Sequence, residues 1–421
     1  MARFDHVDRG RFGLMARKIA FACCVGVVGG LASVALCLAV DAAAKYFSHH
    51  HEALFLLPLF GFATMLVYRL LKIPFTTGTD TVIDDARAGR NIPPALTPAI
   101  FAGTFLSVLG GGSVGKEAAT LQMGASLGGL VARAFGLRLP EDASETEGLA
   151  ISCGMAAAFS ALFFAPVGAT VFVVELVRLK KGVRKEVPYL FIAALCGFGV
   201  ASAVNIGDRV AAVSLPDLSV LLVAACVLVG ALSGLFGSLF SWALRTARRR
   251  TGAWPGKGAL GIVFGGAIVI AVVAGFGQYH LAGPGAAVLD QALTATVLPT
   301  DFLAKAVLTV AAIGFGYKGG EIMPVFCIGG LLGNALGQLI GFDAGFCAML
   351  GLAAFFGACS KCPLAAIAMG GELFGIAALP ALALAVGVSS LVTSELGMYG
   401  RGMWASVRRE YRAVRAKQKV R

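Results

Sequence analysis

Runs of apolar residues separated by short polar stretches cover most of this chain. Several runs fall well below the roughly 20 residues that a helix needs to cross a bilayer, and the 56 glycines interrupt them further. We therefore expect membrane helices, some of them broken or re-entrant. Irregular backbone survives at membrane depth only where protein or a water-filled cavity satisfies it, so the pattern favours a transport path. The apolar runs lie at 19–43, 53–68, 95–109, 118–136, 149–177, 188–206, 218–243, 259–276, 302–316, 322–340, 344–357 and 363–396.

The composition supports the same class of protein. Hydrophobic residues make up 58% of the 421 positions and charged residues only 14%, and the mean hydropathy is +0.83. A chain this apolar and this long is predicted to be an all-α polytopic membrane protein. We expect an N-terminal segment, a first membrane repeat, a second membrane repeat and a basic tail, at residues 1–18, 19–206, 207–400 and 401–421.

The distribution of lysine and arginine predicts the topology. Cytoplasmic loops of membrane proteins are enriched in these residues. We therefore expect the basic segments, and with them both termini, to be cytoplasmic, and we interpret the net charge of +12 as topology rather than as nucleic-acid binding. The basic segments are the N-terminus, 69–72, 178–185, 245–250 and the tail after Arg401. Segments with few or no basic residues, expected on the opposite side, are 44–52, 205–217 and 278–300.

The ten cysteines lie in or beside apolar runs and are interpreted as small packing residues. Cys359 and Cys362 have the spacing of a redox or metal-binding pair, and His49 to His51 form a short histidine run. Packing and a loop outside the membrane explain these two features better. We therefore expect no metal and no cofactor.

An internal repeat organises the chain. The series Gly154, Pro166, Glu175 recurs with the same spacing as Gly351, Pro363, Glu372. A second pairing sets Gly115-Lys-Glu beside Gly320-Glu-Ile, with Gly124 and Gly128 beside Gly329 and Gly333. Repeats in membrane transporters commonly place the substrate site at their interface, with the N-termini of half-helices directed at an anion. These matches do not indicate whether the repeats are parallel or inverted.

The stretch Gly110 to Glu117 begins like the phosphate-binding loop of a nucleotide enzyme, but Glu117 replaces the hydroxyl residue that would hold magnesium. A glycine-rich turn that leads into an apolar helix also creates an anion site, because the first N–H groups of the helix are unpaired and its macrodipole is positive there. Glu117 is then a tethered rival of the bound anion. When ionised it occupies the helix start, and when protonated it leaves.

These residues resemble the CLC family of anion channels and anion/proton antiporters. The resemblance covers nearly the whole membrane portion and implies inverted, CLC-like repeats, one pore in each protomer and a homodimer. It identifies Glu117 as similar to the family's gating glutamate. It further implies backbone ligands to the anion and an anion-coordinating tyrosine and hydroxyl. These are Lys116 to Ala118, Glu321 and Ile322, Tyr399, and Thr77 with Thr79 as the alternative if the register slips.

Four positions depart from the family pattern. Ala118 and Ala119 replace Gly-Pro after the gate, and Asp80 replaces a proline. Leu176 follows Glu175 where many antiporters have a second glutamate on the internal proton route. Glu321 adds a carboxylate to the second anion loop, as in fluoride-exporting and other divergent bacterial members, and is either a substitute proton carrier or a structural cap.

The sequence therefore predicts halide/proton antiport across a bacterial inner membrane, with Glu117, Glu321 and Glu175 as the gating and proton residues. Chloride is favoured and fluoride is the alternative ion. A passive anion channel stays open because of Leu176. A membrane-embedded hydrolase is a remote alternative, since the chain has no metalloprotease motif or nucleophile elbow. We expect no enzymatic activity, and expect halide, proton, lipid and a second copy of the chain as partners.

Overall fold

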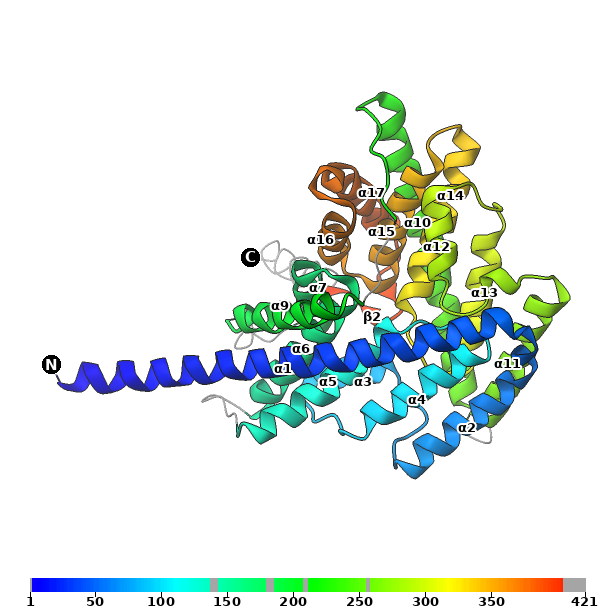
Figure 1. Cartoon of the computed structure of the whole chain (residues 1–421). Coiled ribbons are helices and arrows are strands. Elements are labelled where there is room, and N and C mark those ends of the chain that lie inside the picture. Colours follow the sequence, from blue (N-terminus) through cyan, green and yellow to red (C-terminus); the bar gives the residue numbers. More distant parts are fainter. Residues whose placement is uncertain (1, 137–142, 179–184, 207–210, 255–257, 404–421) are drawn as a thin grey trace, which may run out of the picture.

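The computed structural model describes residues 2–136, 143–178, 185–206, 211–254 and 258–403, and within them the protein is almost entirely helical (Figure 1). The first part contains α1 (Ala2–His49), η1 (His51–Leu56), α2 (Leu57–Leu70), α3 (Thr79–Ala88), α4 (Leu96–Leu109), α5 (Glu117–Ala134), α6 (Ala143–Phe163), α7 (Pro166–Val177) and α9 (Val187–Val204). The second part contains α10 (Val220–Gly252), α11 (Ala259–Gly275), η2 (Tyr279–Leu281), α12 (Ala286–Thr294), α13 (Asp301–Gly314), α14 (Ile322–Ile340), α15 (Ala344–Ser360), α16 (Pro363–Phe374), η3 (Ile376–Ala378) and α17 (Leu379–Val392). A short antiparallel pair, β1 (Leu396–Gly397) and β2 (Gly400–Arg401), follows.

Within the described residues, six helices are long and apolar enough to cross a membrane, and six further apolar helices are shorter. The expected broken helices are therefore present. The apolar run 149–177 divides into α6 and α7 at Phe164, which has a left-handed φ of 54°. Pro166 then starts α7, where its missing N–H is harmless. The run 363–396 divides after Phe374 at Gly375, whose φ is 94°.

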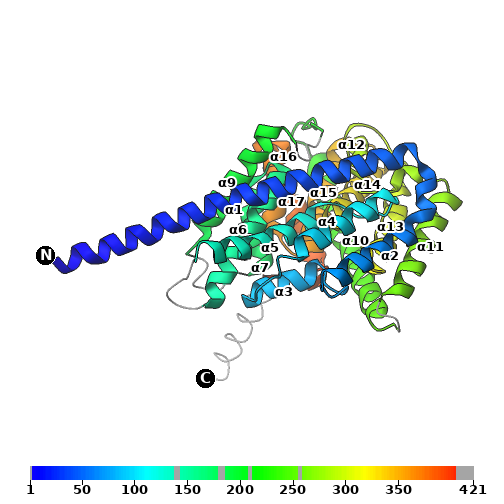
Figure 2. The same ribbon diagram turned by 60° about the horizontal axis from the view of Figure 1, so that its bottom comes forward.

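The first helix extends across the expected segment boundary at residue 18, which stays a prediction. Helix α1 continues without interruption from Ala2 to His49. Its 48 residues span roughly 70 Å at 1.5 Å per residue, more than twice the ~30 Å hydrocarbon layer. Figures 1 and 2 show the N-terminal part projecting beyond the body, while the rest crosses α4, α5, α6 and α9, against which it packs. No proline interrupts the N-terminal segment, so nothing stops the helix there. The basic tail lies mostly outside the described residues.

The two repeats contain the same close helix pair. Helix α5 crosses α6 where Gly124 faces Gly154, and α14 crosses α15 where Gly329 faces Gly351. A β-carbon at any of these four positions would collide with a backbone carbonyl oxygen of the facing helix. Small residues allow membrane helices to approach this closely. The repeated glycine spacing in the sequence is therefore a repeated helix crossing.

We expect Gly154→Ala to lower the free energy of unfolding by about 1–3 kcal/mol, because the facing backbone of Gly124 cannot move aside. Gly199→Ala is the matched control, since a β-carbon there meets no atom within 4 Å. The control should be neutral or slightly stabilising, because alanine reduces the freedom of the unfolded chain. Thermal unfolding of both variants in detergent tests this, and equal losses would contradict the crossing.

The contacts between the repeats are reciprocal. Gly115 and Gly320, which are equivalent in the repeat, form an antiparallel bridge in which each N–H donates to the other's carbonyl at 2.6 Å. The carboxylate of Glu175 in α7 accepts from the amide of Ala365 at the start of α16, at 2.8 Å. In return Glu372 in α16 accepts from the amide of Gly168 at the start of α7, at 2.6 Å. Such an exchange of equivalent contacts is what an approximate two-fold axis between inverted repeats produces.

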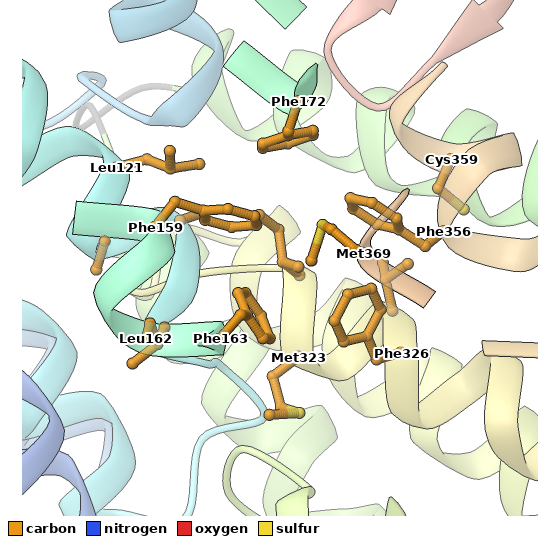
Figure 3. Packing of buried hydrophobic residues seen from close by; sticks show 14 of the residues in the cluster. Leu121, Phe159, Leu162, Phe163, Phe172, Met323, Phe326, Phe356, Cys359 and Met369 are labelled. Carbon is orange, nitrogen blue, oxygen red and sulfur yellow. The ribbon is translucent and has the colours of Figure 1, made fainter. Parts of the chain in front are cut away.

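Aromatic rings fill the space between the repeats (Figure 3). Phe159 and Phe172 of the first repeat stack with ring centroids 4.8 Å apart. Phe326 and Phe356 of the second repeat lie 4.9 Å apart. Phe163 contacts Phe326 across the boundary at 5.4 Å. Aromatic pairs add about 0.5–1.5 kcal/mol each beyond the area that they bury, so this cluster joins the halves beside Met323, the residue that contacts the site described next.

Candidate functional site

Three helices begin inside the protein around one buried region. Helix α5 begins at Glu117, α14 at Ile322 and α3 at Thr79. The residues just before these starts, Lys116, Glu321 and Gly78, provide no side-chain cap. Each start therefore directs backbone N–H groups and the positive end of a helix dipole into the protein.

Glu117 is completely buried, and its carboxylate lies on the start of the opposite repeat. Its Oε2 atom accepts from the backbone N–H of Met323, in the first turn of α14, at 3.0 Å. The glutamate of one repeat thus occupies the anion-favouring end of the other repeat's helix. Gly115 makes room for it, because a β-carbon there would collide with the Glu117 carboxylate.

Gly320, the equivalent residue of the second repeat, has no side chain that would cover the first backbone N–H groups of α5. A β-carbon at Gly320 would lie 2.6 Å from the backbone nitrogen of Ala118 and 3.1 Å from that of Glu117. Ala118 and Ile322 are both fully buried in the first turns of their helices. The predicted backbone ligands are thus brought together at the bridge between the repeats.

Two cavities lie on either side of this bridge. The first, here called the Lys116 pocket, has a volume of about 510 Å³ and is lined by Asp41, Lys116, Glu117 and Met323 among others. The second, the Lys318 pocket, has a volume of about 260 Å³. Arg248, Thr251, Gly252 and Gly258 contribute to the Lys318 pocket, and residues 279–288 contribute to the Lys116 pocket. The two pockets therefore adjoin segments that the charge distribution assigns to opposite sides of the membrane, and Glu117 lines the Lys116 pocket.

The side chain of Lys116 does not face the helix start. Its Nζ atom forms an ion pair with Asp41 of α1 at 2.7 Å and contacts the sulfur of Cys37 at 3.0 Å. The predicted role of the Lys116 backbone as an anion ligand stays a prediction. The positive charge of Lys116 instead contributes to the wall of the Lys116 pocket.

Glu321 belongs to a buried polar network that opens toward the Lys318 pocket. Its Oε1 atom is 3.3 Å from Arg248 Nη2, and the hydroxyl of Thr79 donates to its Oε2 atom at 3.3 Å. The side-chain amide of Gln122 donates in turn to the Thr79 hydroxyl at 3.1 Å. Glu321 is fully buried, and Arg248 keeps 18% of its side chain exposed. A fully buried carboxylate without a cation would be very costly, so Arg248 is its counter-ion.

The helix register distinguishes Thr77 from Thr79. Thr79 is the first residue of α3 and is buried against Glu321, whereas Thr77 precedes the helix. The carbonyl of Thr77 accepts from Lys318 Nζ at 2.9 Å. The hydroxyl beside Glu321 is therefore that of Thr79, the alternative that the sequence left open, and anion binding by either threonine stays a prediction.

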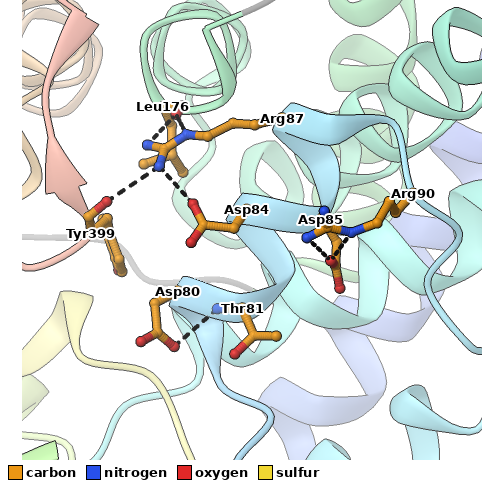
Figure 4. A network of polar contacts seen from close by, with 8 residues as sticks. All are labelled: Asp80, Thr81, Asp84, Asp85, Arg87, Arg90, Leu176 and Tyr399. Atoms are coloured by element: carbon orange, nitrogen blue, oxygen red, sulfur yellow. Dashed lines mark hydrogen bonds and ion pairs between the residues drawn. The ribbon is translucent and has the colours of Figure 1, made fainter. Parts of the chain in front are cut away.

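Tyr399 reaches the same network from the turn between β1 and β2. Its side chain is buried near Glu321 and Arg248, and its hydroxyl has no hydrogen-bond partner among the described residues. Figure 4 shows how Arg87 holds this turn in place. Arg87 donates to the carbonyl of Tyr399 at 3.4 Å, to that of Leu176 at 2.8 Å and to the carboxylate of Asp84 at 3.0 Å. The hairpin, α7 and α3 are thereby tied together.

Glu175 lies apart from these residues. Its carboxylate caps the start of α16, and it lines neither of the two pockets. This contact favours a structural role, and proton transfer through Glu175 stays a prediction. Leu176 accepts from Arg87 through its backbone carbonyl. Its apolar side chain brings no acid to this region.

Arg248, Lys318 and Gln122 were not predicted from the sequence as site residues. All three line the Lys318 pocket. Arg248 belongs to a basic run that was interpreted only as topology. Lys318 comes two residues before the Gly320 motif, and Gln122 comes five residues after Glu117 in α5. Their proximity to the motifs was the available signal. Their direction into the protein depends on helix rotation, which the motifs do not specify.

The fold and the site define a multi-pass α-helical membrane protein with inverted repeats, whose broken helices present their starts to one buried site. The family model described as voltage gated chloride channel matches residues 62–394. The chain therefore belongs to the CLC family of anion channels and transporters.

The chain is also similar to one relative in sequence and to two solved structures. It is 31% identical over 402 residues to a chloride/fluoride channel protein of Pseudomonas syringae pv. tomato, covering 91% of this chain and 86% of that one. A crystal structure of a CLC-type fluoride/proton antiporter superposes with a TM-score of 0.84 at 25% identity, covering 92% and 98%. A slow cyanobacterial Cl⁻/H⁺ antiporter has the same fold, with a TM-score of 0.79 at 20% identity and coverage of 91% and 96%.

Proposed function

We propose that this chain exchanges a halide for protons across the membrane, with Glu117 as the gate. The contact between the Glu117 carboxylate and the Met323 amide is the observation that carries the proposal. A carboxylate that occupies an anion-favouring helix start between two pockets excludes an anion from that position while it is ionised.

One exchange step follows from this competition. An anion that enters from the Lys318 pocket reaches the starts of α5 and α14 and displaces the carboxylate. Glu117 then takes up one proton, loses its attraction for the α14 start and moves into the Lys116 pocket, which it already lines. Release of that proton restores the carboxylate and drives it back to the helix start.

Glu321 is proposed as the acid that serves the opposite side, in place of the glutamate missing at Leu176. It is buried between Thr79 and Arg248, on the side of the site where the Lys318 pocket opens. Protonation of Glu321 would remove its attraction for Arg248 and free the guanidinium to attract an incoming anion. Tyr399, beside Glu321, completes the wall that this anion passes.

For the transported ion we place fluoride ahead of chloride, which reverses the preference drawn from the sequence. Two comparisons support this order: the 31%-identical relative is named a chloride/fluoride channel protein, and the 25%-identical structure is a fluoride/proton antiporter. The buried carboxylate of Glu321 beside the second helix start is a further feature that the sequence associated with the fluoride branch.

We further propose the setting in which the chain works. The two repeats, 19–206 and 207–400, form one pore in each protomer of a homodimer in a bacterial inner membrane. Both termini lie on the cytoplasmic side, because the basic segments predict that orientation. The Lys318 pocket then opens to the cytoplasm and the Lys116 pocket to the outside.

Flux of fluoride and of chloride, recorded together with pH in proteoliposomes that contain the purified protein, tests the proposal. We expect an outward anion gradient to drive protons inward against their own gradient, with a higher rate for fluoride. A reversal potential that follows the anion alone would replace the antiporter with a passive channel, the alternative that Leu176 favours. Equal rates for both ions would contradict the order of the ions but not the exchange.

A further inference from the structure

A groove runs along the exposed side of α10, between this helix, α11 and α13. Its inner part is a cavity of about 320 Å³ with an entirely apolar lining. Its neighbouring part, of about 460 Å³, ends at polar and aromatic residues. Ala243, Ile268 and Phe315 line both parts, so the two cavities form one continuous groove.

The apolar part of the groove is open to the surroundings of the helices. Leu239, Leu303 and Val307 line it and are 56%, 51% and 49% exposed. Apolar side chains exposed in this way on a membrane protein face lipid chains, because no water is present there to oppose the exposure.

The other end of the groove has the chemistry of a membrane interface. Trp254 and Arg250 line it, and Arg250 is exposed. Tryptophan is enriched at the level of lipid headgroups, and the arginine fork matches the geometry of a phosphate. Among the described residues, no acidic side chain lines either part of the groove. The charge at this end is therefore complementary to an anion.

The dimensions fit one leaflet of a bilayer. From Phe240, in the apolar part, to Arg250, in the polar part, α10 rises about 15 Å at 1.5 Å per residue. Half of the ~30 Å hydrocarbon layer is the same distance. A headgroup at Arg250 therefore places the acyl chain of the same molecule beside the apolar cavity.

We propose that this groove binds one anionic phospholipid, with the phosphate on Arg250 and an acyl chain in the cavity between α10, α11 and α13. The site also adjoins the ion path, because Thr251 and Phe315 line both the groove and the Lys318 pocket. Thr251 additionally donates to the carbonyl of Gly314 at 3.0 Å and joins α10 to α13 at this point. Lipid binding stands independently of the proposed halide/proton exchange.

Native mass spectrometry of the purified full-length protein, titrated with phosphatidylglycerol or with phosphatidylcholine of the same chains, tests the site. We expect the wild type to retain phosphatidylglycerol preferentially. Arg250→Gln should lower that retention about fivefold, since one basic residue near the membrane surface contributes about 1 kcal/mol. Arg249→Gln is the matched control, because Arg249 is exposed on the same turn but does not line the groove. No preference for phosphatidylglycerol, or equal losses in the two variants, would overturn the proposal.

A second variant addresses the acyl chain. Ala306→Phe fills the apolar cavity without changing any charge, and we expect it to lower the retention of phosphatidylglycerol. Soluble glycerol phosphate should not displace the lipid, because it has no chain to occupy the cavity. Displacement by glycerol phosphate would reassign the groove to free phosphate, and a changed oligomeric state of Ala306→Phe would reassign it to contact between copies. Either result would overturn the lipid site.

Discussion

Glu117→Gln is expected to abolish proton movement driven by an anion gradient, with a loss on the order of a hundredfold or more in proton flux. The glutamine oxygen can still accept from the Met323 amide, but the side chain has no charge to compete with the anion and no proton to deliver. Anion flux should persist without coupling. Simultaneous recording of pH and anion flux in proteoliposomes measures both effects.

Glu175→Gln is the matched control for this experiment. It alters another buried glutamate that caps the start of a helix in the opposite repeat, but one that lines neither pocket. Its amide oxygen can retain the contact with the Ala365 amide, so coupling should survive. Persistent proton flux in Glu117→Gln would remove the proposed gate. Loss of coupling in Glu175→Gln would instead support the proton role that the sequence suggested for Glu175.

Arg248→Met is expected to lower the free energy of unfolding by about 3 kcal/mol, the lower end of the range for breaking a buried ion pair. The substitution leaves the fully buried Glu321 carboxylate without its cation, while Thr79 remains its hydroxyl donor. We choose the lower end because Arg248 keeps 18% of its side chain exposed. Thermal unfolding in detergent, calibrated against the wild type, measures the loss.

The double variant Arg248→Met with Glu321→Gln separates charge from packing. Since neither member of this ion pair then carries a charge, we expect the double variant to be more stable than Arg248→Met alone. Arg249→Met, at the exposed neighbouring position, should change stability little. A double variant as unstable as the single one would show that Arg248 stabilises the protein by packing, and that Glu321 is not ionised in the folded state.

Much of the fold was predictable from local pattern. The lengths of the apolar runs predicted that several helices are too short to cross a membrane. The break before Pro166 follows the rule that proline cannot continue a helix with an intact hydrogen-bond ladder. The matched series of Gly154 and Gly351 predicted equivalent segments, which the helix crossings explain. The full length of α1 was not predictable, because a drop in hydropathy at residue 18 does not stop a helix.

The candidate site was predictable where it depends on helix starts. Glycine-rich turns before Glu117 and Ile322 indicated two starts that favour an anion, because unpaired N–H groups accompany any such start. The choice between Thr77 and Thr79 was not predictable, since a shift of two residues in the start of α3 decides which hydroxyl is buried. The ion pair between Arg248 and Glu321 was not predictable either. A basic run near a membrane edge has the same pattern whether or not one of its arginines points into the protein.

The sequence by itself determined the membrane helices, their breaks, the repeat and the glutamate at the helix start, because each depends on residues that are close along the chain. Only the tertiary structure decided that the Glu117 carboxylate lies on the helix of the other repeat, that Glu175 and Glu372 exchange caps, and that Arg248 neutralises Glu321. Those contacts join positions far apart in sequence. Their pairing depends on how the two inverted halves pack. The pattern of residues within a short segment does not specify that packing.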